Sequence, residues 1–214
     1  MKILNRLLSI AFLTLPMLLL PAPSVMAQQN YVGEISRMRG PAFVRGVNRF
    51  ELGRVGTKLR TGDRVLTGVG TRLDMTMIDG SSITLGDTTD FTVKSYDYVP
   101  ADDVGRAVFS FLKGAFVAVT GGIGKVSSPD FRVQTPVATM GVRGTTFWGG
   151  LKFFDDELHL ALLDGKGVFL ENQAGRTEIR QVGYGARAGA GTRPTAPVLW
   201  APSKMNAAKA SVTW

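Results

Sequence analysis

Apolar and polar residues alternate with a period of two along most of this chain, which predicts β-strands. The alternation is clearest where Leu73, Met75 and Met77 alternate with Asp74 and Thr76. Asp79-Gly80 then supplies a tight-turn dipeptide, and the alternation resumes at Ile83 and Leu85. This stretch is therefore expected to form a hairpin with one buried face.

The same strand pattern recurs at Phe91 and Val93, around Gly114, and in residues 153–172, where alternate leucines precede Asp164-Gly165. No segment keeps the spacing of an amphipathic helix, and the 26 glycines fall mostly between the apolar runs. Two similar openings, at Gly56 and Gly70, favour stacked repeats. We predict an all-β fold, either a sandwich or a short solenoid-like stack of antiparallel hairpins.

The first 27 residues have the pattern of a secretory signal peptide. Lys2 and Arg6 precede an apolar stretch at 7–20, which is shorter than a bilayer crossing, and small residues lead to Ala27. We expect cleavage between Ala27 and Gln28 and a periplasmic or secreted chain with no integral membrane span. A retained anchor is the open alternative.

The expected domain occupies residues 28–188, and a tail rich in proline and alanine covers residues 189–214. The composition of the tail predicts a flexible or loosely docked segment. Trp200 and Trp214 argue against that for part of the tail, so we also expect residues 195–201 to pack as an extra edge segment with Trp200 docked.

Composition and charge exclude several functions. The chain has no cysteine, which excludes thiol chemistry and thiolate metal sites. Its formal net charge is +8, but the basic residues are scattered as singles, so nucleic-acid binding is not expected. A moderate positive charge suggests contact with an acidic envelope surface, or simply solubility.

Catalytic candidates are few. The one histidine, His159, stands at an outward-facing position and is interpreted as a surface residue. The acidic clusters Asp102-Asp103 and Asp155-Asp156-Glu157 fall in expected turns without calcium-loop spacing, so they are interpreted as solvated carboxylates. There is no Gly-x-Ser-x-Gly motif or complete phosphate-binding loop. We therefore expect a protein that is not an enzyme and has no catalytic residue, cofactor or metal site.

The stretch TPVATMGVRGTTF, residues 135–147, combines an apolar run with an arginine between two glycines. Gly141 and Gly144 allow the backbone to bend sharply around Arg143. If Arg143 points inward, it is a structural clamp that needs a carboxylate or strand carbonyls as partners, which is the interpretation we favour. If it points outward, it is an interaction residue. Trp148 is a second candidate, either as a stacking platform for a ligand or as a core residue.

This stretch resembles the signature of the FecR domain, the extracytoplasmic region of bacterial surface-signalling regulators. The matching residues are Thr135, Pro136, Ala138, Gly141, Val142, Arg143, Gly144, Thr145 and Phe147. Segments upstream, LRTGDRVLTG and LDMTMIDGSSITLG, are also similar to the family, and the likeness covers about Val32 to Gly185. The resemblance implies an all-β domain that binds proteins or signals.

Full regulators of that family carry a cytoplasmic segment that holds a sigma factor. Here the domain follows the expected signal peptide directly, so we expect no anti-sigma activity. We expect an exported binding module that recognises another envelope protein or senses a signal in the periplasm. The alternative is a module that binds a cell-wall glycan or a small ligand.

Replacing Arg143 distinguishes its two roles. If the side chain is a buried, paired clamp, Arg143→Ala lowers the free energy of unfolding by several kcal/mol, as measured by thermal or denaturant melts. An unchanged melting curve together with lost binding would instead place Arg143 on the functional surface.

Overall fold

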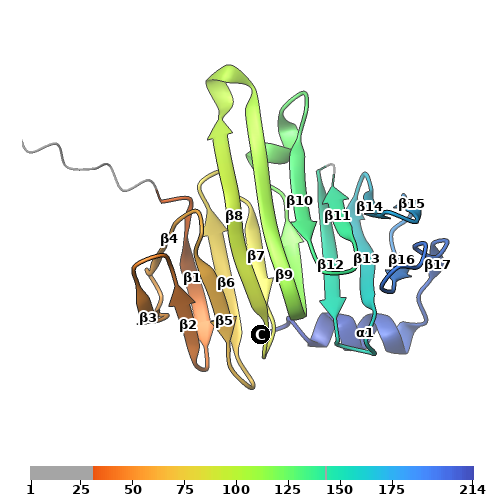
Figure 1. Ribbon diagram of the computed structural model, residues 1–214, viewed down its shortest axis with the longest axis horizontal. Coiled ribbons are helices and arrows are strands. Elements are labelled where there is room, and N and C mark those ends of the chain that lie inside the picture. Colours follow the sequence, from red (N-terminus) through yellow and green to blue (C-terminus); the bar gives the residue numbers. More distant parts are fainter. Residues whose placement is uncertain (1–30, 143) are drawn as a thin grey trace, which may run out of the picture.

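The computed structural model describes residues 31–142 and 144–214. Seventeen strands in this part of the chain join into one mixed sheet, which one long strand folds into two packed layers (Figure 1). The all-β prediction is confirmed, with a sandwich rather than a solenoid. The expected signal peptide and Arg143 lie outside the described residues.

The long strand is β9 (Val104–Val119), and it belongs to both layers, here called sheets A and B. The order in sheet B is β3 (Phe50–Leu52), β2 (Ala42–Arg45), β5 (Arg64–Thr67), β8 (Asp90–Val99), the first part of β9, β10 (Asp130–Gln134), β11 (Thr139–Val142), β14 (Val168–Asn172) and β15 (Gly175–Ile179). The order in sheet A is β4 (Lys58–Leu59), β1 (Gly33–Arg39), β6 (Arg72–Met77), β7 (Ser82–Leu85), the last part of β9, β12 (Thr145–Leu151), β13 (Leu158–Gly165), β16 (Tyr184–Ala188) and β17 (Val198–Leu199). Of these pairings only that between β9 and β10 is parallel.

Gly114 bends β9 from sheet B into sheet A. Its φ is +99°, in the left-handed region that favours glycine, and a Cβ there would lie 2.3 Å from the Thr89 hydroxyl. Before the bend Phe109 and Phe111 point into the core, and after it Phe116 does, so the phase of the alternation shifts at the glycine. The bend therefore turns both halves of one strand toward the same core.

Phenylalanine side chains fill the space between the two sheets. Phe116 lies 4.9 Å from Phe111, 5.4 Å from Phe91 and 5.6 Å from Phe147, measured between ring centroids. Phe91 and Phe111 come from sheet B and Phe147 from sheet A, so these tilted and edge-to-face contacts join the layers.

Asp79 is a buried connection at one end of the sandwich. The predicted Asp79-Gly80 turn joins β6 to β7, as expected. The carboxylate accepts hydrogen bonds from the backbone and hydroxyl of Ser81, from the Tyr96 hydroxyl of β8, and from the Ile123 amide of the 3-10 turn η2 (Gly122–Lys125). Burial raises the pKa of Tyr96, and the hydrogen bond to Asp79 raises it further. The carboxylate thus links strands of both sheets to η2. The other 3-10 turn, η1 (Pro100–Asp102), lies between β8 and β9.

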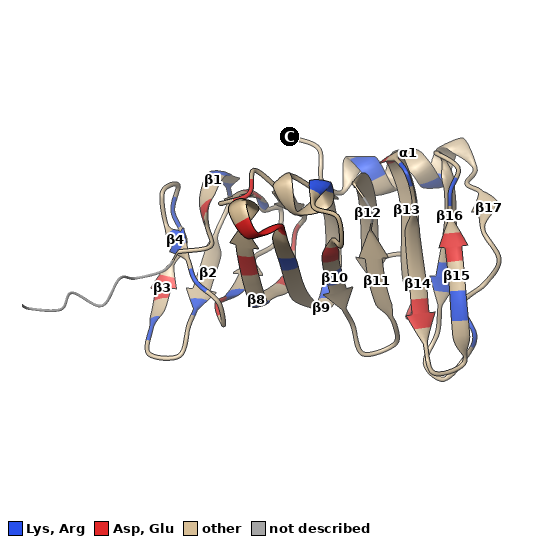
Figure 2. Cartoon of the chain, turned by 90° about the horizontal axis from the view of Figure 1, so that it is seen from above, with Lys and Arg blue, Asp and Glu red and all other residues tan. Residues whose placement is uncertain are grey.

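The C-terminal segment packs on the outer face of sheet A. Strand β17 pairs with β16, and Trp200 is only 6% exposed, which confirms that Trp200 docks on the sheet. Helix α1 (Pro202–Ala210) then runs crosswise to β12 and β13 (Figure 1) and lies along one side of the molecule (Figure 2). Beyond it, the Trp214 indole donates to Asp74 of β6. The expectation of a loose tail is therefore wrong for these residues.

No helix within the described ranges is long and apolar enough to cross a membrane.

The bend at Gly114 predicts a specific sensitivity. Gly114→Ala combines a positive φ with a clash against Thr89, so it lowers the free energy of unfolding by roughly 2 kcal/mol or more. Gly56→Ala is the matched control, because Gly56 has a φ of +89° and open space around its Cα. Denaturant melts compare the two, and equal losses would show that the contact with Thr89 is unimportant.

Candidate functional site

The first three signature residues build the turn between β10 and β11. The Thr135 hydroxyl accepts hydrogen bonds from the amides of Val137 and Ala138, at 3.2 and 3.1 Å, and donates to the Ala138 carbonyl at 2.7 Å. Pro136 lies within this turn, where its fixed φ and missing N–H are tolerated. These residues set the register of the hairpin that carries Gly141.

Gly141 makes room for an aromatic ring on the outer face of sheet B. It is paired in register with Phe169 of β14, and a Cβ at Gly141 would lie 2.0 Å from the Phe169 ring. Any larger residue would displace the ring. The neighbouring Val142 points into the core instead.

The rest of the signature forms the crossover from sheet B to sheet A. Gly144 has a φ of +62°, and Thr145 starts β12. The Thr145 amide donates to the Thr120 hydroxyl at 2.8 Å, and the Thr145 hydroxyl donates to the Gly167 carbonyl at 3.0 Å. Phe147 continues into the phenylalanine core. The described signature residues thus shape a turn, a crossover and the core.

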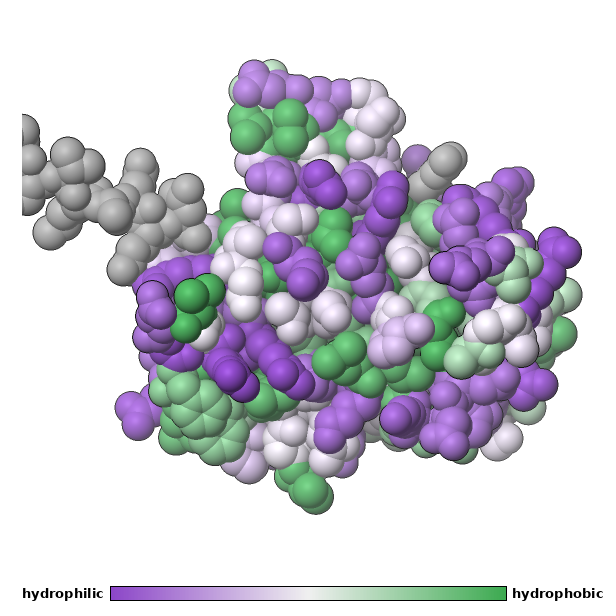
Figure 3. Space-filling model, viewed as in Figure 1, coloured by the Kyte–Doolittle hydropathy of each residue, from purple (hydrophilic) through white to green (hydrophobic). Residues whose placement is uncertain are grey.

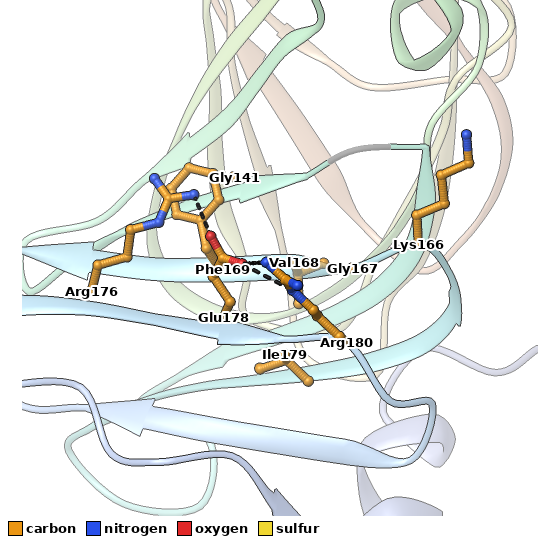
Figure 4. A pocket seen from close by; sticks show the side chains of 9 residues that line it. All are labelled: Gly141, Lys166, Gly167, Val168, Phe169, Arg176, Glu178, Ile179 and Arg180. Atoms are coloured by element: carbon orange, nitrogen blue, oxygen red, sulfur yellow. Dashed lines mark hydrogen bonds and ion pairs between the residues drawn. The ribbon is translucent and has the colours of Figure 1, made fainter.

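A surface groove lies beside this crossover, on the outer face of sheet B (Figure 4). Its volume is about 360 Å³. The residues used below are Gly141, Lys166, Phe169, Arg176, Glu178 and Arg180, from β11, β14, β15 and the adjoining loops. Sequence analysis missed this groove, because β14 and β15 must pair before its residues meet.

Charged and aromatic groups share the groove. The Arg176 guanidinium stacks 3.7 Å from the centre of the Phe169 ring and bonds to Glu178 at 3.2 Å. Glu178 also accepts a hydrogen bond from Arg180 at 3.0 Å, and this bond is the main reason why the pKa of Glu178 is lowered. Lys166 forms no ion pair with any described residue. An aromatic ring, a stacked arginine and an unpaired lysine together form a surface that can bind a polypeptide.

Trp148 lies in the core under α1. It is 0% exposed, packs edge-to-face on Trp200, and its indole N–H donates to the Ser211 hydroxyl at 3.0 Å. Of the two roles considered for Trp148, the structure places it in the core role, so its ring offers no open platform for a ligand.

His159 is also buried, and its interpretation as a surface residue is wrong. It does point away from the sandwich interior, but Phe154, Trp200 and Lys204 of α1 pack around it, and it is only 2% exposed. Its Nε2 lies 2.8 Å from Asp155, and its Nδ1 lies 3.1 Å from the Lys204 amine, which stands over the Trp200 ring. Burial lowers the pKa of His159, and the charge of Lys204 lowers it further against the opposing effect of Asp155. A neutral His159 ring can accept a hydrogen bond from the Lys204 amine and donate one to the Asp155 carboxylate, so that all three groups have a partner.

Asp155, Glu157 and His159 are close enough to be considered as metal ligands, with donor atoms within 4.8 Å of one another. However, Asp155 already bonds to His159 and to the Glu157 amide, and the Glu157 carboxylate pairs with Arg187 at 3.1 Å. These donors are engaged in holding the loop, so we assign no metal to them. The two carboxylates are structural, rather than the freely solvated groups that were expected.

Comparisons with known proteins agree with this fold. Residues 63–166 match the family model described as FecR protein, which confirms the resemblance. A candidate anti-sigma factor from Parabacteroides distasonis ATCC 8503, solved at 1.65 and 2.50 Å, superposes with a TM-score of 0.53 in both structures, at 13% and 12% identity. The alignment covers 67% of this chain and 62% of the solved chain. No curated protein matches.

The buried His159 predicts a pH dependence. Its pKa in the folded state is lower than the 6.5 of a free histidine, so the unfolded chain takes up the proton first. The stability that the neutral His159 contributes is therefore fully present above about pH 6.5, and it is lost as the pH drops toward the folded-state pKa. Denaturant melts between pH 5 and 8 measure this slope.

His159→Gln should flatten the slope between pH 5 and 7, because the chain has no other histidine. A variant with the same slope as the wild type would contradict the neutral, buried state of His159.

Proposed function

We propose that this chain, whose residues 63–166 match the FecR family model, is an exported, non-enzymatic module that binds another protein in the bacterial periplasm and takes part in sensing a signal there. The observation that carries the proposal is the groove around Phe169 and Arg176, which opens beside the signature crossover on the uncovered face of sheet B. The pattern of residues 1–27 supports export.

The chemistry of the groove favours a protein partner. Aromatic and arginine side chains are enriched among the residues that dominate protein–protein binding energy. Glu178, held between Arg176 and Arg180, gives the groove both signs of charge, which suits the polar rim of an interface. Acids and bases stand side by side on β14 and β15 (Figure 2).

The alternative is a cell-wall glycan or a small ligand, and it has less support. Sugar rings stack on open aromatic faces, but Trp148 is buried, and Arg176 covers the Phe169 ring. A glycan would have to displace Arg176 before it could stack there.

The histidine also supports a role without catalysis. A catalytic base must be able to reach a substrate. His159 is hydrogen-bonded on both ring nitrogens and is 2% exposed. The solved relatives are described as candidate anti-sigma factors, but at 13% identity the likeness shows the fold, and we propose the binding module without that activity.

Crosslinking in intact cells tests the proposal. A photoreactive residue replaces Arg180, whose side chain is 78% exposed, in a tagged chain that carries its own leader. We expect one envelope protein to be recovered at near-equal amount. The same residue at Lys94, exposed on β8 and outside the groove, should not recover that protein.

A second pair of variants shows whether the groove itself binds. Phe169→Ser should abolish the crosslink and leave the chain folded, since Phe169 lies on the outer face, whereas Lys94→Ala should leave the crosslink unchanged. Recovery of cell-wall fragments would favour the glycan alternative. Equal crosslinking from both positions, or none from either, would contradict binding through this groove.

A further inference from the structure

The hairpin of β2 and β3 exposes apolar side chains at the opposite edge of sheet B. Phe50 is 67% exposed, Leu52 49% and Phe43 39%. The rings of Phe43 and Phe50 are parallel within 6°, with centroids 5.3 Å apart, and Phe43 is paired in register with Leu52. These three side chains therefore form one apolar patch on the outer face of the sheet.

The tip and flank of the hairpin extend the patch. Val47, in the turn between the two strands, is 91% exposed. Arg45 is exposed on the same face as Phe50 and forms no ion pair with the described residues. We call Phe43, Arg45, Val47, Phe50 and Leu52 the β2–β3 face. Figure 3 shows a green area over these strands at the lower left.

This composition needs an explanation, because a contiguous exposed apolar patch on a soluble domain usually marks an interaction site. The charge around the patch indicates which kind of partner it fits. Residues 43–55 contain three arginines and one glutamate, Glu51. The glutamate forms an ion pair with Arg49. Arg45 and the side chain of Arg54 have no described acidic partner.

A second copy of this chain is a poor occupant. A symmetric contact would bring two unpaired Arg45 side chains into one interface, and like charges brought together there are costly. An anionic surface would instead satisfy the arginines. Apolar side chains that enter the interface region, flanked by cations that meet phosphates, are the features of proteins that lie on anionic membranes.

The end of the sandwich that carries the patch also carries the first described residue. Tyr31, the first described residue, lies under the Lys58 amine of β4, at 5.7 Å. Strands β3 and β4 are the edges of the two sheets at this same end (Figure 1). Tyr31 therefore lies at the same end of the sandwich as the β2–β3 face.

We propose that the β2–β3 face docks on the surface of an anionic phospholipid bilayer. Val47, Phe43 and Phe50 enter the boundary between headgroups and acyl chains, and Arg45 meets the phosphates. The groove at Phe169 lies near the other edge of sheet B, next to β15, so it stays free for its partner while the chain is docked.

Vesicle sedimentation tests the proposal with the chain from Gln28 onward, which keeps the whole described fold and lacks the apolar leader. A cooperative thermal melt first shows that this chain and each variant are folded. The probes are vesicles of phosphatidylcholine alone and vesicles of equal parts phosphatidylcholine and phosphatidylglycerol. We expect sedimentation with the anionic vesicles, weakened by added salt, and little with the neutral ones.

Phe50→Ser should lower the partition coefficient on anionic vesicles about tenfold or more, because an aromatic side chain that enters the bilayer is lost. Arg45→Gln should lower it about fivefold. Val182→Ser is the matched control: Val182 is 57% exposed in the turn before β16, and its replacement should change nothing.

Three results would overturn the proposal. These are equal binding to both kinds of vesicle, no binding to either, and wild-type binding by Phe50→Ser. If light scattering shows a dimer that Phe50→Ser converts to a monomer, and no vesicle binding is seen, the face joins two copies of the chain instead.

Discussion

The bend of β9 at Gly114 is the constraint on which the rest of the structure depends. One strand supplies inward-facing phenylalanines to both sheets, and the positive φ of the glycine resets the alternation so that each half faces the same core. Thr89 bridges the bend, since its hydroxyl lies 3.2 Å from the Ala115 amide and 3.1 Å from the Ala115 carbonyl. Because strands on both sides of β9 hydrogen-bond to it, the two layers cannot separate without breaking this strand.

This arrangement gives the two outer faces different roles. The C-terminal segment covers the outer face of sheet A, where Trp148, Trp200 and Ala208 form a second small core. Over much of that sheet the face is therefore occupied by the chain itself. The outer face of sheet B, in contrast, carries the groove at one edge and the β2–β3 face at the other. Our proposals place a protein partner and a membrane surface on these two sites.

Much of the fold could be predicted from the sequence, because local alternation determines strands. The hairpin at Asp79-Gly80 and the all-β class both follow from a period of two. His159 could not be interpreted in this way, since the alternation shows only that it points away from the core. Its burial depends in part on Trp200 and on Lys204 of α1, the latter 45 residues later in the chain, which no local pattern reveals.

The candidate site, too, could be predicted from the sequence only in part. The signature residues were visible as a motif, and their glycines indicated a bend. The groove, however, depends on Gly141 lying opposite Phe169 and on Arg176 reaching across from β15. The first contact needs β11 to pair with β14, about 30 residues later in the chain, and the second needs β14 to pair with β15. A glycine in the middle of a strand was the one available signal that a neighbouring side chain lies across the backbone.

Native-state hydrogen exchange, followed by mass spectrometry, tests the central claim that β9 unites both layers. The account predicts that amides on both sides of Gly114, from Phe109 to Ala118, exchange only through global unfolding and with one common free energy. If the half of β9 after Gly114 exchanged through a separate opening of lower free energy, the two sheets would be independent units, and the account would be contradicted.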